Sequence, residues 1–125
     1  MSYKSFEEPN VWKKCREFRK SNSLICKFLP TEKKYKLADQ IIRSSRSATA
    51  DIAEGHGRYH FQENIQSCRQ ARGSLIETMD HLIVATDEGY IDQKKLAELR
   101  LNYSICLRLL NGYILDLKNR KSGGK

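Results

Sequence analysis

Residues 96–117, LAELRLNYSICLRLLNGYILDL, decide the fold of this chain. Their apolar side chains recur at alternating steps of three and four without a break, as they do on one face of an α-helix. That face consists of Leu96, Leu99, Tyr103, Cys106, Leu110, Tyr113 and Leu117. The segment therefore predicts a long amphipathic helix that packs against other helices.

Three earlier segments repeat this spacing, and no strand-type alternation competes with them. Their stripes are Val11, Cys15, Phe18, Asn22, Ile25 and Leu29; Ala38, Ile41, Ser45, Ala48 and Ile52; and Phe61, Ile65, Cys68, Leu75, Met79, Leu82 and Thr86. Four helices joined by short connections predict an all-α protein, an antiparallel up-down four-helix bundle. Residues 1–117 form its single domain, and residues 118–125 are expected to be a flexible basic C-terminal tail.

The expected helix ends coincide with residues that favour helix termini. Asn10 and Thr31 are expected to cap the first and second helices, and Asp92 the fourth. Pro30 ends the first helix, because the residue before a proline avoids the helical conformation.

The octapeptide DIAEGHGR, residues 51–58, lies at the end of the second pattern. It combines carboxylates, glycines, a histidine and an arginine, and could be a site or a helix stop. Gly55 and Gly57 are expected to stop the helix, because glycine adopts the left-handed conformation at helix C-termini. Gly89 is expected to end the third helix in the same way.

Arg72 interrupts the third stripe, at a place where a core residue is expected. An arginine buried without a partner is strongly destabilising, so it should be paired. Glu54, which also lies close to an apolar face, is the expected partner, which makes Glu54 and Arg72 a structural polar pair.

No residue pattern supports catalysis, a metal site or a cofactor. The cysteines at positions 15, 26, 68 and 106 form no Cys-x-x-Cys pair, and they are expected to be reduced core residues. His56 and His60 are separated by Gly57, and Glu-x-x-His does not occur. A cleft that united Glu54, His56 and Arg58 would revive the enzyme alternative. With no signal peptide and no apolar run long enough to span a membrane, the sequence predicts a cytoplasmic protein.

The formal net charge of +8 favours anionic partners, with nucleic acid first. The excess of cations is concentrated in residues 1–58. A basic stripe opposite the first apolar face comprises Lys13, Arg16, Lys20 and Lys27, and the second helix adds Lys36 and Arg43. Two interpretations stay open: a solvated polar face or a surface for phosphate backbones. Aromatic residues are not interleaved with these charges, so a base-stacking platform is not expected.

The fourth helix carries a second apolar stripe, Leu101, Ile105 and Leu109. A helix that is apolar on two faces is buried on two sides. Because the outer side of a four-helix bundle has no partner within the chain, this stripe predicts self-association. The alternative is coverage by the N-terminal segment around Tyr3 and Phe6.

Several motifs along the chain resemble one family of four-helix bundles. The most specific are Gln40 to Ser47 followed by Asp51-Ile52-Ala53-Glu54-Gly55-x-Gly57-Arg58, and Arg72-Gly73-Ser74-Leu75-x-Glu77. Further pieces are Phe6 with Val11-Trp12, Leu29-Pro30 with Glu32, Tyr35-x-Leu37 and Gly89-Tyr90-Ile91. Together they resemble the proteins encoded in intervening sequences of bacterial 23S rRNA genes, over residues 3 to 117. The same superfamily includes the accessory variability determinant of diversity-generating retroelements.

The resemblance implies a bacterial cytoplasmic protein that forms a ring-like homopentamer and has no enzymatic activity. In the retroelement branch, such rings bind nucleic acid and a reverse transcriptase through basic surfaces. The leading hypothesis is therefore a homo-oligomeric bundle that binds structured RNA or DNA through its basic stripe, largely independently of sequence. The rival is a protein-interaction scaffold, such as a reverse-transcriptase accessory protein, in which the charge only aids solubility.

Overall fold

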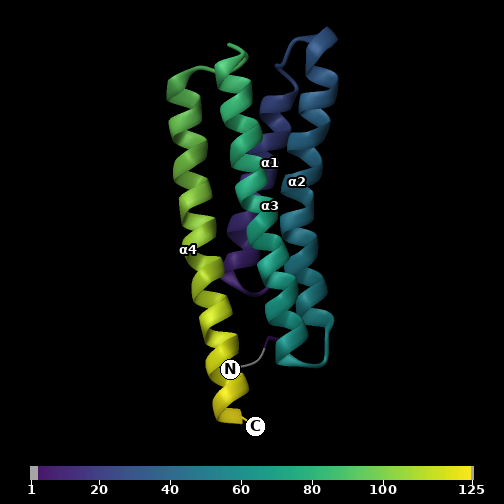
Figure 1. Ribbon diagram of the computed structural model, residues 1–125, viewed down its shortest axis with the longest axis vertical. Helices are drawn as coiled ribbons and strands as arrows, with labels where there is room; N and C mark the ends of the chain where they lie inside the picture. The colour runs from purple at the N-terminus through teal and green to yellow at the C-terminus, as the bar shows by residue number, and fades with distance from the viewer. Residues whose placement is uncertain (1–2, 125) are drawn as a thin grey trace.

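The computed structural model describes residues 3–124, with the side chains of 31–34 and 124 left aside. Its described part is built from four helices: α1 (Asn10–Cys26), α2 (Thr31–Gly57), α3 (Phe61–Asp87) and α4 (Gln93–Gly124). They run alternately up and down, as Figure 1 shows. The predicted all-α, antiparallel four-helix bundle is confirmed.

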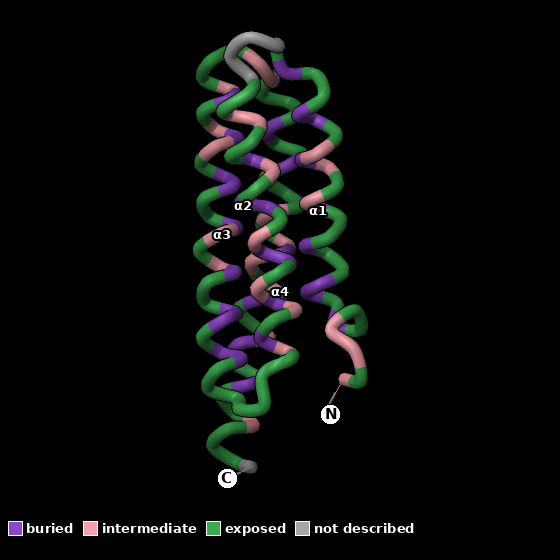
Figure 2. The backbone as a smooth tube through the Cα atoms, turned by 90° about the vertical axis from the view of Figure 1, so that its right-hand side faces the viewer, coloured by how far each residue is buried: buried purple, intermediate pink, exposed green. Residues whose placement is uncertain are grey.

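Each helix packs against two neighbours. Helix α1 packs beside α2 and α4, and α3 packs beside α2 and α4, whereas the backbones of the diagonal pairs lie farther apart in the described residues. The buried residues follow the inward side of every helix (Figure 2). Phe18, Ile41, Leu75 and Leu110, one from each helix, are almost completely buried, as their stripes predict. Phe61 is the exception, because this first residue of α3 is exposed.

Two of the three predicted N-caps are wrong. Asn10 and Thr31 are the first residues of their helices, and the caps are Pro9 and Pro30 without side-chain hydrogen bonds. Both prolines are extended, and the Pro9 carbonyl accepts hydrogen bonds from the Trp12 and Lys13 N–H groups. The third cap is confirmed, since Asp92 Oδ1 accepts a hydrogen bond from the Lys95 N–H at 2.8 Å.

The third helix ends at a left-handed Gly89 as predicted, whereas α2 ends at Gly57 as predicted but without the left-handed conformation. Gly89 has a φ of +82°, donates its N–H to Thr86, and is followed by the Tyr90 N–H donating to Ala85. This is the hydrogen-bond pattern of a left-handed helix ending. Gly55 and Gly57 have no such conformation, and α2 ends because Arg58 is extended.

Gly55 has a packing role instead. A Cβ at this position would lie 2.5 Å from Asn64 Oδ1 and 3.0 Å from Ser67 Cβ of α3. The absence of a side chain therefore lets the last turns of α2 approach α3 closely. Small residues continue this contact between α2 and α3. Thr78 Oγ1 of α3 donates a buried hydrogen bond to Ser44 Oγ of α2 at 2.7 Å.

The four helices differ in length, and the difference shapes one end of the bundle. Helix α1 has 17 residues, whereas α2 and α3 have 27 each and α4 has 32. Among the described residues, the N-terminal segment lies beneath the start of α1 at this end (Figure 2). Helix α4 continues to Gly124, so residues 118–124, expected as a tail, are helical. Whether they are flexible in solution stays a prediction.

Candidate nucleic-acid interface

The basic stripe predicted from the sequence lies on the outer face of α1. Its members Lys13, Arg16, Lys20 and Lys27 are all exposed, and so are Lys36 and Arg43 of α2. We call these four residues, three in α1 and Lys27 directly after its last residue, the α1 basic face. Among the described residues, no carboxylate forms a salt bridge with its three lysines. These ammonium groups are therefore available to an anionic partner.

Two cations of this region have partners that fix their positions. The Arg16 guanidinium lies over the Trp12 ring, 5.8 Å from its centroid, in a cation–π contact. Arg43 Nη1 lies 3.6 Å from Asp39 Oδ2, in an exposed salt bridge that reduces its local charge. Of the six predicted contact residues, Arg43 therefore offers the least net charge to a partner.

Two exposed aromatic rings neighbour cations of this surface in the sequence. Phe28 is 80% exposed and follows Lys27, and Tyr35 is 82% exposed and precedes Lys36. The helical stripes do not include either ring. Phe28 lies in the connection between α1 and α2, and Tyr35 lies near the start of α2 outside its apolar stripe.

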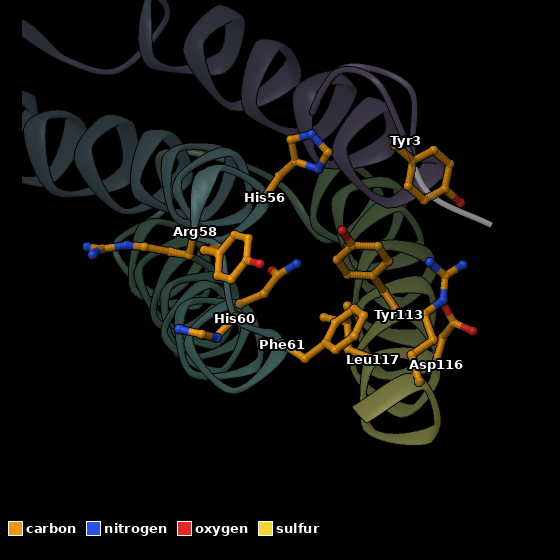
Figure 3. A pocket seen from close by; sticks show the side chains of 11 residues that line it. Tyr3, His56, Arg58, His60, Phe61, Tyr113, Asp116 and Leu117 are labelled. Carbon is orange, nitrogen blue, oxygen red and sulfur yellow. The ribbon is translucent and has the colours of Figure 1, made fainter. Parts of the chain in front are cut away.

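The octapeptide ends at a pocket of about 150 Å³, on the end of the bundle that α1 does not reach. We call it the end pocket. Figure 3 shows His56 of α2, Phe61 of α3 and Tyr113 of α4 around one space, with Arg58 and His60 pointing to its outer side. Tyr59 and Asn64 also line the pocket, as does Tyr3 of the N-terminal segment.

The wall formed by α4 is partly polar and held by short-range interactions. Arg120 Nε lies 3.0 Å from Asp116 Oδ2, and both side chains line the pocket. Burial raises the pKa of the Tyr113 hydroxyl, an effect that a hydrogen bond with Asn64 reduces. The Tyr113 ring also meets the Tyr3 ring at a centroid distance of 6.5 Å.

The predicted polar pair between Glu54 and Arg72 is wrong. Glu54 Oε2 lies 2.9 Å from Nη2 of Arg58, the residue directly after the end of α2. Arg72 faces α4 instead of α2, and its Nη1 donates to Asn111 Oδ1 at 2.8 Å. Because α2 continues to Gly57, the side chain of the C-cap residue Arg58 can reach Glu54, four residues earlier.

A second basic groove, of about 410 Å³, lies between α3 and α4 near the same end. Arg69, Lys118 and Lys121 line it, and Lys121 Nζ donates to Gln62 Oε1 at 2.6 Å. No carboxylate is among its lining residues. Sequence analysis missed this groove because its cations come from two helices that are far apart in the chain.

Two features of the described residues bear on metal binding and on thiol chemistry. They contain no group of three or more His, Cys, Asp or Glu residues placed to hold a metal ion. Burial, together with the charge of Asp51, raises the pKa of the Cys68 thiol to about 12. A hydrogen bond with Cys106 and burial raise the pKa of Cys15 as well. Protonated, buried thiols are poor nucleophiles.

The second stripe of α4 divides between solvent and core. Leu101 is 64% exposed, whereas Ile105 and Leu109 are half-buried and Leu109 packs against the core. Leu115, exposed to a similar degree, extends the outer apolar face of α4. The N-terminal segment packs elsewhere, since Phe6 meets the Trp12 ring at 5.2 Å.

A family model described as 23S rRNA-intervening sequence protein matches residues 7–112, most of the chain. The chain belongs to this family. The match includes the α1 basic face and the octapeptide, and it ends one residue before Tyr113. The α4 side of the end pocket therefore lies outside the part that the family model matches.

A solved relative of this 23S rRNA-intervening sequence family member has the same fold. It is the 1.70 Å crystal structure of a protein with unknown function from the S23 ribosomal protein family of Bacteroides thetaiotaomicron VPI-5482. The two chains are 26% identical and superpose with a TM-score of 0.77, over 83% of this chain and 97% of the other. A search of curated proteins found no match. None of the described helices is long and apolar enough to cross a membrane.

Proposed function

We propose that this protein is a non-enzymatic, homo-oligomeric bundle that binds structured RNA or DNA in the cytoplasm through the α1 basic face. The observation that carries the proposal is the row of exposed cations on α1, whose lysines form no salt bridge with a described carboxylate. The family description, which names an intervening sequence of 23S rRNA, favours RNA as the partner.

Binding through this face is electrostatic and largely independent of sequence. A rigid helix presents its cations at intervals of about one or two turns, and they meet phosphates without reaching base edges. Each phosphate contact releases counterions, so the affinity falls steeply as salt concentration rises. Lys36 and Arg43 extend the same interaction onto α2, with a smaller contribution from Arg43 because of its salt bridge.

Self-association through the outer face of α4 completes the proposal. Leu101 and Leu115 leave large apolar side chains in water on a single chain. A second copy would cover them, and a ring of five copies is the arrangement that the family resemblance implies. In such a ring, several α1 basic faces act on one nucleic acid, which raises the avidity.

The test is the triple reversal Lys13→Glu, Arg16→Glu and Lys20→Glu. We expect it to weaken binding to a hairpin RNA by about a hundredfold or more at low salt and to lower the salt slope by about three. Fluorescence anisotropy across a salt series measures both quantities, and light scattering checks that the oligomer is intact.

The matched control reverses Lys94, Lys95 and Arg100, three exposed cations in the first turns of α4. It changes the net charge by the same amount, so a specific α1 surface predicts a much smaller loss. Equal losses in the two variants would mean that only net charge matters. If the parent protein binds no RNA even at low salt, the scaffold alternative stands instead.

A further inference from the structure

We infer that the end pocket binds a single unpaired nucleobase, with the flanking phosphates held by the cations around it. This inference rests on the proposed function and deepens it, because it assigns single strands to one end of the bundle and duplexes to the α1 basic face. The ligand class is a pyrimidine or purine base within an unpaired stretch of RNA or DNA.

The end pocket is a built feature of the fold. Helix α1 begins at Asn10, and the other three helices extend beyond its start (Figure 2). The described part of the bundle therefore has three helices instead of four at this end. The N-terminal segment covers part of the opening through the contact of Tyr3 with Tyr113. The close approach of α2 and α3 at Gly55 fixes Asn64 on the opposite wall.

Aromatic rings from three segments surround the space. Tyr113 comes from α4, Phe61 from the start of α3, and Tyr59 from the turn between α2 and α3. Tyr59 is 92% exposed. Among the described residues, its one ring contact is with the neighbouring His60, at a centroid distance of 4.9 Å. Exposed rings beside cations are the elements with which proteins stack unpaired bases.

The polar groups of the pocket suit the edge of a base. Asn64 is buried, and its amide carries both a donor and an acceptor; it already bonds the Cys68 thiol at 3.5 Å and the Tyr113 hydroxyl, so a base would exchange with or add to these partners. Asp116 adds an acceptor, and His56 adds ring nitrogens. These groups line a small, partly open pocket of about 150 Å³.

Cations near the pocket could hold the phosphates that flank a bound base. Arg58 and Arg120 line it, and each is oriented by a salt bridge to a carboxylate, which reduces the net charge it offers. Arg69 and Lys118 line the second basic groove, which has no carboxylate among its lining residues. A strand that placed a base in the pocket would therefore find, in this second groove between α3 and α4, cations that form no salt bridge with a described carboxylate.

The experiment compares a labelled oligouridylate with a blunt RNA duplex of the same length by fluorescence anisotropy. The variant Tyr59→Ala with Phe61→Ala removes two exposed rings, so the bundle should fold. We expect it to weaken oligouridylate binding by about ten- to a hundredfold and duplex binding by less than about twofold. The matched control, Ile76→Ala with Val84→Ala, removes two exposed apolar side chains of α3 that lie outside both proposed surfaces, and it should leave both affinities within about twofold.

A direct readout is photocrosslinking of an oligouridylate that carries 5-iodouridine, followed by peptide mapping. Crosslinks to residues 56–64 or to Tyr113 are expected, and crosslinks only to residues 28–36 would overturn the inference. So would an unchanged affinity for oligouridylate in the Tyr59 and Phe61 variant. If that result accompanies loss of duplex binding in the α1 triple reversal, only this inference fails; if neither variant affects any binding, the proposed function fails as well.

Discussion

The α1 basic face and the end pocket both contain cations, but they are built in opposite ways. The first is a row of side chains on one helix, exposed and mostly without partners among the described residues. The second is a concavity to which the N-terminal segment, α2, α3 and α4 all contribute. A row of cations recognises charge, whereas a pocket with aromatic walls also recognises the shape of what enters it.

The two regions also differ in how much they depend on packing. The side chains of the α1 basic face need only a helix beneath them, and Arg16 rests on Trp12 of the same helix. The end pocket needs α2 and α3 at the short distance that Gly55 allows. Changes in the core should therefore affect base recognition before they affect phosphate binding.

The largest expected effect comes from Gly55→Val. Its side chain would overlap Asn64 and Ser67 and push α2 away from α3, which we expect to lower the free energy of unfolding by about 1–3 kcal/mol. Because Asn64 lines the pocket, oligouridylate binding should fall as well, while duplex binding at the α1 basic face persists. Urea denaturation and anisotropy on the same samples measure the two effects.

Gly73→Ala is the matched control, because nothing lies within 4 Å of a Cβ at this position. An alanine in the exposed interior of α3 should raise the free energy of unfolding by about 0.5–1 kcal/mol. Equal destabilisation by the two substitutions would show that the close approach at Gly55 is not what constrains the end of the bundle.

The same contrast explains which features could be predicted from the sequence. The α1 basic face follows from helical spacing alone, since its residues share one helix and one side. The bundle follows for the same reason, because the four stripes each fix an inward face. The end pocket depends on where α1 begins. Pro9 is the N-cap in place of the expected Asn10, so the helix begins at Asn10 itself.

The errors in the octapeptide have one physical source. Glycine serves both helix stops and close helix contacts, and a sequence does not distinguish the two uses. Because a helix stop is expected at Gly55, the sequence pattern does not indicate Arg58 as the partner of Glu54, although Arg58 lies four residues later and forms the salt bridge. Pairing Glu54 with Arg72 also required that Arg72 face α2, whereas α3 presents its small residues, such as Ser74 and Thr78, to that helix.

A second prediction uses loss of the oligomer to distinguish binding at the α1 basic face from binding at the end pocket. We expect Leu101→Glu to place a charge in the subunit interface and to leave a monomer in light scattering. A long structured RNA, which several α1 basic faces contact, should then bind about a hundredfold more weakly because avidity is lost. A short oligouridylate should bind as before, since one end pocket is sufficient for it.

Asn102→Glu adds the same charge at the next residue, which is exposed and outside the apolar stripe. This control should remain oligomeric and keep its affinity for the long RNA. An unchanged mass for Leu101→Glu would show that the outer face of α4 is not the interface.

The smallest expected effect concerns Asp51, which opens the octapeptide and belongs to neither surface. Burial raises the pKa of its carboxyl, and the charge of Glu54 raises it further, although a hydrogen bond from Ser47 lowers it. The folded state therefore binds the proton more tightly than the unfolded chain does. Stability rises as pH falls from above the raised pKa toward the ordinary value of about 3.9, and the ionised carboxylate costs stability at neutral pH.

Asp51→Asn removes that charge and keeps an acceptor for the Ser47 hydroxyl. We expect the melting temperature to rise by a few degrees at most at pH 7 and the gain to shrink near pH 4, where the parent carboxyl takes up its proton. Binding to duplex and to oligouridylate should both stay unchanged. Asp80→Asn, at an exposed site on α3, should give no comparable gain. A gain of equal size at both pH values would show that the carboxylate charge is not its cause.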